Sequence, residues 1–116
     1  MVEIKCSSKE LSKVEAYIMT ASNQGTSMKD VPDNAEIQVN IWAFVERTNE
    51  DTGEEMELLS IFDGQNVYVT HSKTFLKSFK EISTIMGDEG YKIRKISGTT
   101  RSGREYIDCQ LVIENM

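Results

Sequence analysis

The strongest constraint on the fold of this chain is a run of alternating apolar residues near its middle. Every second residue of this run is apolar, namely Ile37, Val39, Ile41, Ala43 and Val45. Strict alternation over this length predicts a long β-strand with one apolar face. Trp42 and Phe44 are expected on the opposite face, where they either meet a ligand or pack beneath a helix.

Further strand and helix patterns flank this run. Ser7 and Glu10 fit a capping box, which predicts a helical N-terminal extension over about residues 7–22. Two shorter strands are expected after the long one, at residues 56–62 and 66–70.

A second helix interrupts the strand pattern in the C-terminal half. Ser72 is a suitable N-cap, and Gly87 suits the C-terminal stop. Two more strands are expected after this helix, at residues 91–97 and 104–113. The apolar residues that recur at helical spacing between the two caps are Phe75, Phe79, Ile82 and Met86.

The order of the expected elements after the first helix is strand, strand, strand, helix, strand, strand. This is the element order of the OB-fold, a small five-stranded barrel whose members often bind single strands or oligosaccharides. A chain of 116 residues is long enough for one domain with its own core. We therefore expect a mainly β protein with two helices, in which residues 1–116 form a single OB-fold domain with an N-terminal helical extension.

Charge is distributed unevenly along the chain. The formal net charge is -6, from 13 basic and 19 acidic side chains. Residues 1–90 hold 8 of the basic and 16 of the acidic side chains, whereas residues 91–116 hold 5 basic and 3 acidic ones. All five of these cations fall within residues 91–104, where there is no acid. A local basic strip on an acidic protein indicates a specific contact with a polyanion rather than a general affinity for one.

The basic segment, residues 91–104, coincides with a predicted β-hairpin. Ser102-Gly103 lies between two strand-like runs, which is typical of a two-residue turn. Such a turn would place Arg101 directly opposite Arg104, and like charges in that position destabilise a hairpin by a few tenths of a kcal/mol. We interpret this cost as a sign of a polyanionic ligand; the alternative is an ordinary solvated arm.

The barrel hypothesis predicts where a ligand binds. OB-folds use the face of their second and third strands, flanked by the loops that join strands 1–2 and 4–5. Cations on that face would neutralise phosphates, and aromatic rings would stack on bases. The sequence alone does not decide on which face of the hairpin the side chain of Arg94 lies. The candidate nucleic-acid-binding residues are Trp42, Arg47, Tyr68, Lys92, Arg94, Arg101, Arg104 and Tyr106.

The expected loop between the first two barrel strands is acidic. Residues 48–55 include Glu50, Asp51, Glu54 and Glu55. Carboxylates repel phosphate, so this loop either folds away from a bound strand, keeps the affinity low, or contacts a protein.

Enzymatic and metal chemistry find little support in the sequence. Cys6 and Cys109 lack the spacing of a zinc site, and His71 is the single histidine. There is no glycine-rich phosphate cradle and no serine elbow. We expect a non-enzymatic protein without metal or cofactor.

Neither a signal peptide nor an apolar run of membrane-spanning length is visible, which predicts a cytoplasmic protein without a membrane partner.

Several short motifs carry a resemblance to a known family. They are Asp63-Gly64, Tyr-Val-Thr-His-Ser at residues 68–72, Lys-Thr-Phe at 73–75, and Gly-Thr-Thr-Arg-Ser-Gly-Arg-Glu-Tyr at 98–106. With these motifs, residues 53–112 resemble small single-stranded-DNA-binding proteins of tailed phages that infect Gram-positive bacteria. The N-terminal helix and the Met-Lys-Asp-Val-Pro motif at 28–32 also fit.

The resemblance implies an OB-fold homodimer that coats single-stranded DNA, largely without sequence preference, during phage replication or recombination. Phage or host replication and recombination proteins would be its partners, in the cytoplasm of the host cell. The sequence departs from many cellular single-strand binders in ending on Val-Ile-Glu-Asn-Met without an acidic tail, so recruitment through such a tail is not expected. The alternative is a phage-encoded effector that inhibits a host protein through its acidic surface.

Overall fold

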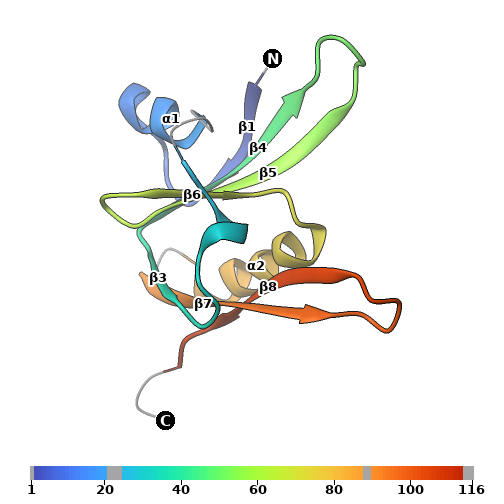
Figure 1. Ribbon diagram of the computed structural model, residues 1–116. Coiled ribbons are helices and arrows are strands. Elements are labelled where there is room, and N and C mark those ends of the chain that lie inside the picture. Colours follow the sequence, from blue (N-terminus) through green and yellow to red (C-terminus); the bar gives the residue numbers. More distant parts are fainter. Residues whose placement is uncertain (1, 21–24, 88–89, 114–116) are drawn as a thin grey trace.

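The computed structural model describes residues 2–20, 25–87 and 90–113. These residues form eight β-strands and two α-helices (Figure 1), which confirms the expectation of a mainly β protein with two helices. Neither helix is long and apolar enough to span a bilayer, and the described residues hold no other candidate span.

The strands belong to two sheets. The larger sheet has the strand order β1-β4-β5-β6-β2, and its pairs are antiparallel except for the short parallel pair of β2 and β6. Its strands are β1 (Val2–Ser7), β2 (Thr26–Ser27), β4 (Ile41–Thr48), β5 (Glu55–Phe62) and β6 (Val67–Thr70).

The smaller sheet is antiparallel and has the order β3-β7-β8. Its strands are β3 (Glu36–Val39), β7 (Tyr91–Thr99) and β8 (Glu105–Leu111). Among the described residues no ladder joins β6 to β8, so the two sheets do not close on each other. The expected five-stranded OB-fold barrel is therefore not confirmed.

The alternating run is divided between the two sheets at Asn40. The backbone N–H of Asn40 donates to Phe62 O at 3.0 Å, and its Nδ2 donates to Asp63 O at 3.0 Å. β3 before this point pairs with β7, whereas β4 after it pairs with β5. The prediction of one continuous apolar face is wrong, because an irregularity of one residue transfers the side chains that follow to the other face.

As a result, the larger sheet is packed on both faces. One face meets α2 (Lys73–Met86) and the smaller sheet, where Phe75 and Phe79 of α2 are fully buried. Trp42 and Phe44 belong to this main core together with Ile37 and Val39 of β3. The rings of Trp42, Phe44 and Phe79 meet edge to face, with centroids 5.3 to 6.1 Å apart.

The other face is covered by α1 (Lys13–Thr20). Met19 packs into a second cluster with Ile41, Ala43, Val45 and Leu58. The hydroxyl of the buried Ser60 donates to Met19 O at 2.6 Å, which fixes the end of α1 to β5. A polar group on a buried face costs free energy unless it is paired, so this bond fixes the position of α1.

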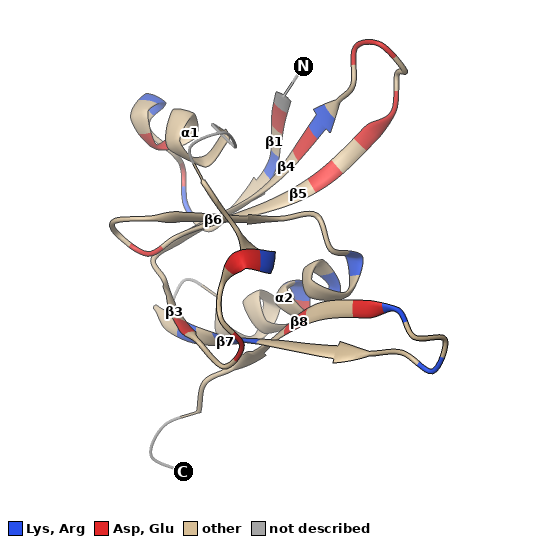
Figure 2. Cartoon of the chain, in the orientation of Figure 1, with Lys and Arg blue, Asp and Glu red and all other residues tan. Residues whose placement is uncertain are grey.

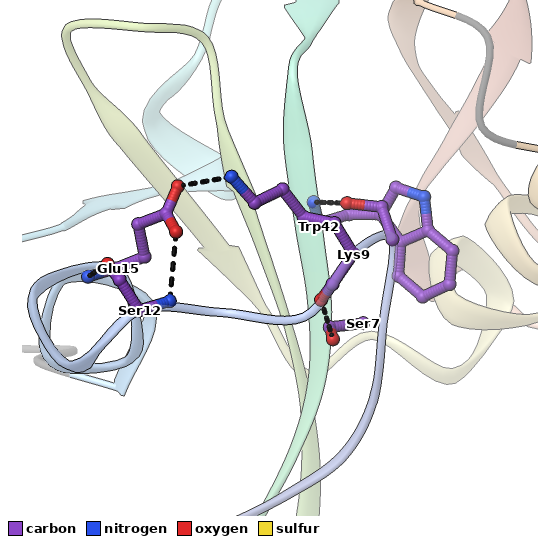
Figure 3. Close-up of polar contacts among 6 residues, drawn as sticks. Ser7, Lys9, Ser12, Glu15 and Trp42 are labelled. Atoms are coloured by element: carbon purple, nitrogen blue, oxygen red, sulfur yellow. Dashed lines mark hydrogen bonds and ion pairs between the residues drawn. The ribbon is translucent and has the colours of Figure 1, made fainter.

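The N-terminal helix begins later than predicted. Residues 2–7 form β1 at the edge of the larger sheet, and the capping box consists of Ser12 and Glu15 instead of Ser7 and Glu10 (Figure 3). Glu15 N–H donates to Ser12 Oγ at 3.1 Å, and Ser12 N–H donates to Glu15 Oε1 at 2.9 Å. The Ser-x-x-Glu pattern occurs twice here, and strand pairing of β1 with β4 leaves only the second copy free to cap. Residues 21–22 of the predicted helix lie outside the described residues.

Replacement of Phe79 by alanine is expected to lower the free energy of unfolding by about 3–5 kcal/mol, because it leaves a cavity at the centre of the main core. Urea denaturation measures this loss. Ile85→Ala on the same helix is the matched control, since Ile85 is 81% exposed and its truncation is expected to cost less than about 0.5 kcal/mol. Equal losses in the two variants would contradict the packing described.

Candidate nucleic-acid interface

The turn of the β7–β8 hairpin differs from the prediction. Thr99 and Glu105 form the last ladder pair, and the N–H of Thr100 donates to Arg104 O at 2.8 Å. Gly103 has φ +85° and donates its N–H to Thr100 O at 2.9 Å. This is a three-residue turn with a left-handed glycine, so Thr100 and not Arg101 lies opposite Arg104. The predicted like-charge pair is wrong, and no internal repulsion has to be explained.

The register of the hairpin determines which side chains face outward. Ile93 and Lys95 of β7 are buried toward the core. Lys92 and Arg94 alternate with them and therefore lie on the outer face of the smaller sheet, which settles the orientation of Arg94. On β8, Tyr106 pairs with Gly98, which belongs to the outer face of β7. Tyr106 and Arg104, two residues apart, therefore lie on this outer face as well, and Arg101 lies in the turn. We call this set, Lys92, Arg94, Arg101, Arg104 and Tyr106, the basic strip.

The two arginines at the hairpin tip are the strip's unpaired cations. Within the described part of the chain, no carboxylate lies within 4.0 Å of the guanidinium of Arg101 or Arg104, and both residues are exposed. Arg94 is different, since its Nη2 lies 3.3 Å from Glu36 Oε2 of the neighbouring strand. Exposed pairs of this kind are worth about 0–1 kcal/mol, so a phosphate competes with Glu36 at little cost.

Tyr106 lies across Gly98, its partner in the ladder. A Cβ atom added to Gly98 would lie 2.5 Å from the Oη and 2.6 Å from the Cζ of Tyr106. The ring can rest on the strand only because residue 98 has no side chain. Tyr106 is still 38% exposed, so the structure holds an aromatic ring in place while leaving part of it open to solvent.

Lys95 is the one cation of residues 91–104 that the fold removes from the surface. It is only 4% exposed, and its Nζ donates to Val31 O at 2.8 Å and pairs with Asp33 Oδ1 at 3.1 Å. Asp33 Oδ2 accepts from the hydroxyl of Ser97 at 2.7 Å. These contacts tie the segment before β3 to the base of the hairpin. The hydrogen bond from Ser97 and the ammonium of Lys95 together lower the pKa of Asp33.

Three predicted site residues lie apart from the strip. Arg47 is half-buried on β4, and its Nη2 donates to Thr20 O at the end of α1, at 3.3 Å. Trp42 is 8% exposed beneath α2, so the packing alternative is confirmed for it, as it is for Phe44. Tyr68 packs against the main core and donates its hydroxyl to Asp63 Oδ2 at 3.4 Å; burial and the Asp63 charge raise the pKa of Tyr68.

The acidic and basic loops are the tips of two different hairpins that project from the molecule. Figure 2 shows carboxylates along the β4–β5 hairpin and cations at the tip of the β7–β8 hairpin. The first hairpin extends from the larger sheet and the second from the smaller one (Figure 1). The acidic loop is therefore separate from the basic strip and does not neutralise it.

The structure also contains a groove that the sequence prediction missed. A cavity of about 700 Å³ lies between β5 and α2. We call it the α2 groove; its lining residues are His71, Lys73, Lys77 and Lys80, with Met56, Leu76, Glu55, Glu57 and Glu81. The signal was present in the sequence, because lysines at i, i+4 and i+7 of a predicted helix share one face. Among the described residues, no three metal-ligating side chains gather into a metal site.

No family model matches the chain, and no match was found among curated proteins or solved structures.

Substitution of Asp33 by asparagine is expected to make thermal stability less dependent on pH. The pKa of Asp33 is lowered in the folded state, so its carboxylate stabilises the fold above the unfolded-state value of about 3.9, and this contribution is lost as the pH falls. Wild type should have the higher Tm near neutral pH, and the two Tm values should converge in acid. Asp51→Asn, in the exposed β4–β5 loop, is the control. A Tm difference that stays constant with pH would contradict the role assigned to Asp33.

Proposed function

We propose that this protein is a non-enzymatic binder of single-stranded DNA, largely indifferent to sequence, and that the strand lies along the basic strip. The observation that carries the proposal is the pair of unpaired arginines at the hairpin tip, followed along the same outer face by Tyr106. Cations that follow a backbone beside an aromatic ring are the usual means of holding single strands. Every base has a π-face, so stacking on Tyr106 requires no particular sequence.

The strand connectivity supports an OB-type assignment. β3 and β4 together take the place of the first barrel strand, and β5, β6, β7 and β8 take the places of the other four. The ladders between the first and second, second and third, first and fourth, and fourth and fifth strands are all present. OB barrels are commonly partly open. We propose that this is an OB-type barrel whose opening lies between β6 and β8.

The resemblance of residues 53–112 to phage single-strand binders supports a biological setting. In this proposal the protein coats single strands during phage DNA replication or recombination in the cytoplasm of a Gram-positive host. It acts as a homodimer beside phage or host replication and recombination proteins.

A second candidate function uses the other projecting hairpin. Glu50, Asp51, Glu54 and Glu55 surround the turn between β4 and β5, and this surface suits a basic protein partner better than DNA. The second candidate is therefore a phage effector that inhibits a host protein through this acidic surface. A pull-down from host lysate with and without nuclease separates the two functions: capture that resists nuclease, without any shift of oligo-dT in a gel, favours the effector.

The double substitution Arg101→Ala and Arg104→Ala is expected to weaken binding to oligo-dT and to flatten its salt dependence. Each lost phosphate contact should reduce the slope of log affinity against log salt by about 0.7, so the pair should reduce it by about 1.4. Fluorescence anisotropy at several salt concentrations measures the slope. Lys13→Ala with Lys29→Ala removes the same charge elsewhere on the surface and should leave the slope nearly unchanged. The same slope in wild type and the arginine variant would exclude the hairpin tip from the site.

Tyr106 is expected to contribute by stacking. Tyr106→Leu keeps an apolar group over Gly98 but removes the ring, and it should cost about 1–3 kcal/mol of binding free energy for one stacked base. Tyr106→Phe keeps the ring and should bind nearly as well as wild type. Titration of the three proteins with the same oligo-dT compares them directly, and equal affinities for the leucine and phenylalanine variants would rule out stacking at this position.

A further inference from the structure

We infer that the α2 groove is a second binding site, and that it takes the phosphodiester backbone of a single strand that continues from the basic strip. The inference rests on the proposed function, and it extends the site from the smaller sheet to the face of α2 beside β5. It assigns a role to Lys73 and Lys77, which the sequence prediction left aside.

The cations of the groove are not equivalent. Lys80 is already engaged, because its Nζ lies 2.7 Å from Glu57 Oε1 and 5.1 Å from the centre of the Phe44 ring. By contrast, no carboxylate of the described residues comes within ion-pair distance of Lys73 or Lys77. These two lysines are one turn apart on the same face of α2, about 6 Å along the helix axis. They offer two adjacent unpaired charges to a chain of phosphates.

The groove also has an apolar wall. Met56 is 48% exposed on β5 and lines the groove together with Leu76 of α2. Methionine is flexible and polarisable, and it makes favourable contacts with aromatic rings of varied shape. An exposed methionine beside unpaired lysines suits a nucleotide, which combines a flat base with a charged phosphate.

The carboxylates of the groove indicate where along it the phosphates lie. Of its three carboxylates, Glu57 is held by Lys80, Glu81 lies one turn beyond Lys77 toward the C-terminus of α2, and Glu55 lies at the start of β5. Phosphates are therefore expected at the opposite end, beside His71, Lys73 and Lys77. That end is also the N-terminus of a 14-residue helix, whose dipole favours negative charge.

The N-terminal end of α2 lies against β8, the strand that carries Tyr106. Ser72, the N-cap of α2, accepts a hydrogen bond from Phe75 N–H and donates its hydroxyl to Ile107 O of β8 at 3.4 Å. Ile107 follows Tyr106, and β8 is an edge strand of the smaller sheet. A strand that passes Tyr106 on the outer face reaches Lys73 by turning around β8, the edge strand that separates this face from α2. This continuity favours the same nucleic acid strand over an acidic peptide as the occupant.

The test is a salt titration with a long and a short oligo-dT, about 16 and about 4 nucleotides, the limits of site size for single OB folds. Lys73→Gln with Lys77→Gln should reduce the salt slope by about 1.4 on the long strand. The short strand is expected to show a smaller change, because it can occupy the basic strip alone. Lys13→Gln with Lys29→Gln is the charge-matched control. A long strand carrying photoreactive thymidine analogues gives a second measurement on the wild-type protein, with crosslinks expected at residues 55–57 or 71–77.

The outcomes separate this inference from the proposed function. A flatter slope in the arginine variant but not in the Lys73/Lys77 variant, with crosslinks confined to the hairpin, would overturn the groove and leave the function standing. Loss of oligo-glutamate binding in the lysine variant, with an unchanged slope on DNA, would make the groove a peptide site and would also overturn the inference. Absence of oligo-dT binding by the wild-type protein would overturn both proposals.

Discussion

The structure depends on the break in the shared strand at Asn40. β3 and β4 are consecutive in the chain but belong to different sheets, and the hydrogen bonds of Asn40 to Phe62 O and Asp63 O hold the point where one sheet passes to the other. Because of the break, the odd-numbered apolar residues before Asn40 face the main core beneath α2, whereas those after it face the second cluster beneath α1. It allows one alternating run to supply apolar groups to α2 on one side and to α1 on the other.

Covering both faces of the larger sheet decides where a ligand can bind. The outer face of β5 carries Leu58 and Ser60, and α1 is fixed over it through Met19, with Arg47 bound to the last turn of that helix. In the proposed OB-type assignment, this is the face that such barrels ordinarily offer to their ligands. The outer face of the β7–β8 hairpin and the groove beside α2 are left uncovered. The proposed function and the further inference place a nucleic acid strand on these two surfaces.

Periodicity predicted the elements but not their contacts. α2 was predicted from Ser72 to Gly87 and forms as expected, because its cap and apolar stripe are local features. The turn was misjudged because Gly103 fits a two-residue and a three-residue loop equally well. The burial of Lys95 depends on carbonyl and carboxylate groups more than 60 positions away, which no local pattern encodes. The lysines of α2 were predictable by the same periodicity that located its apolar face.

The most direct test of the account is to map the amide chemical shifts that change when oligo-dT is added to the isotopically labelled protein. We expect changes concentrated in residues 92–107 and 71–77, with little change on α1 or in the β4–β5 loop. Changes centred on residues 46–57, or a spectrum that oligo-dT leaves unaltered, would contradict it.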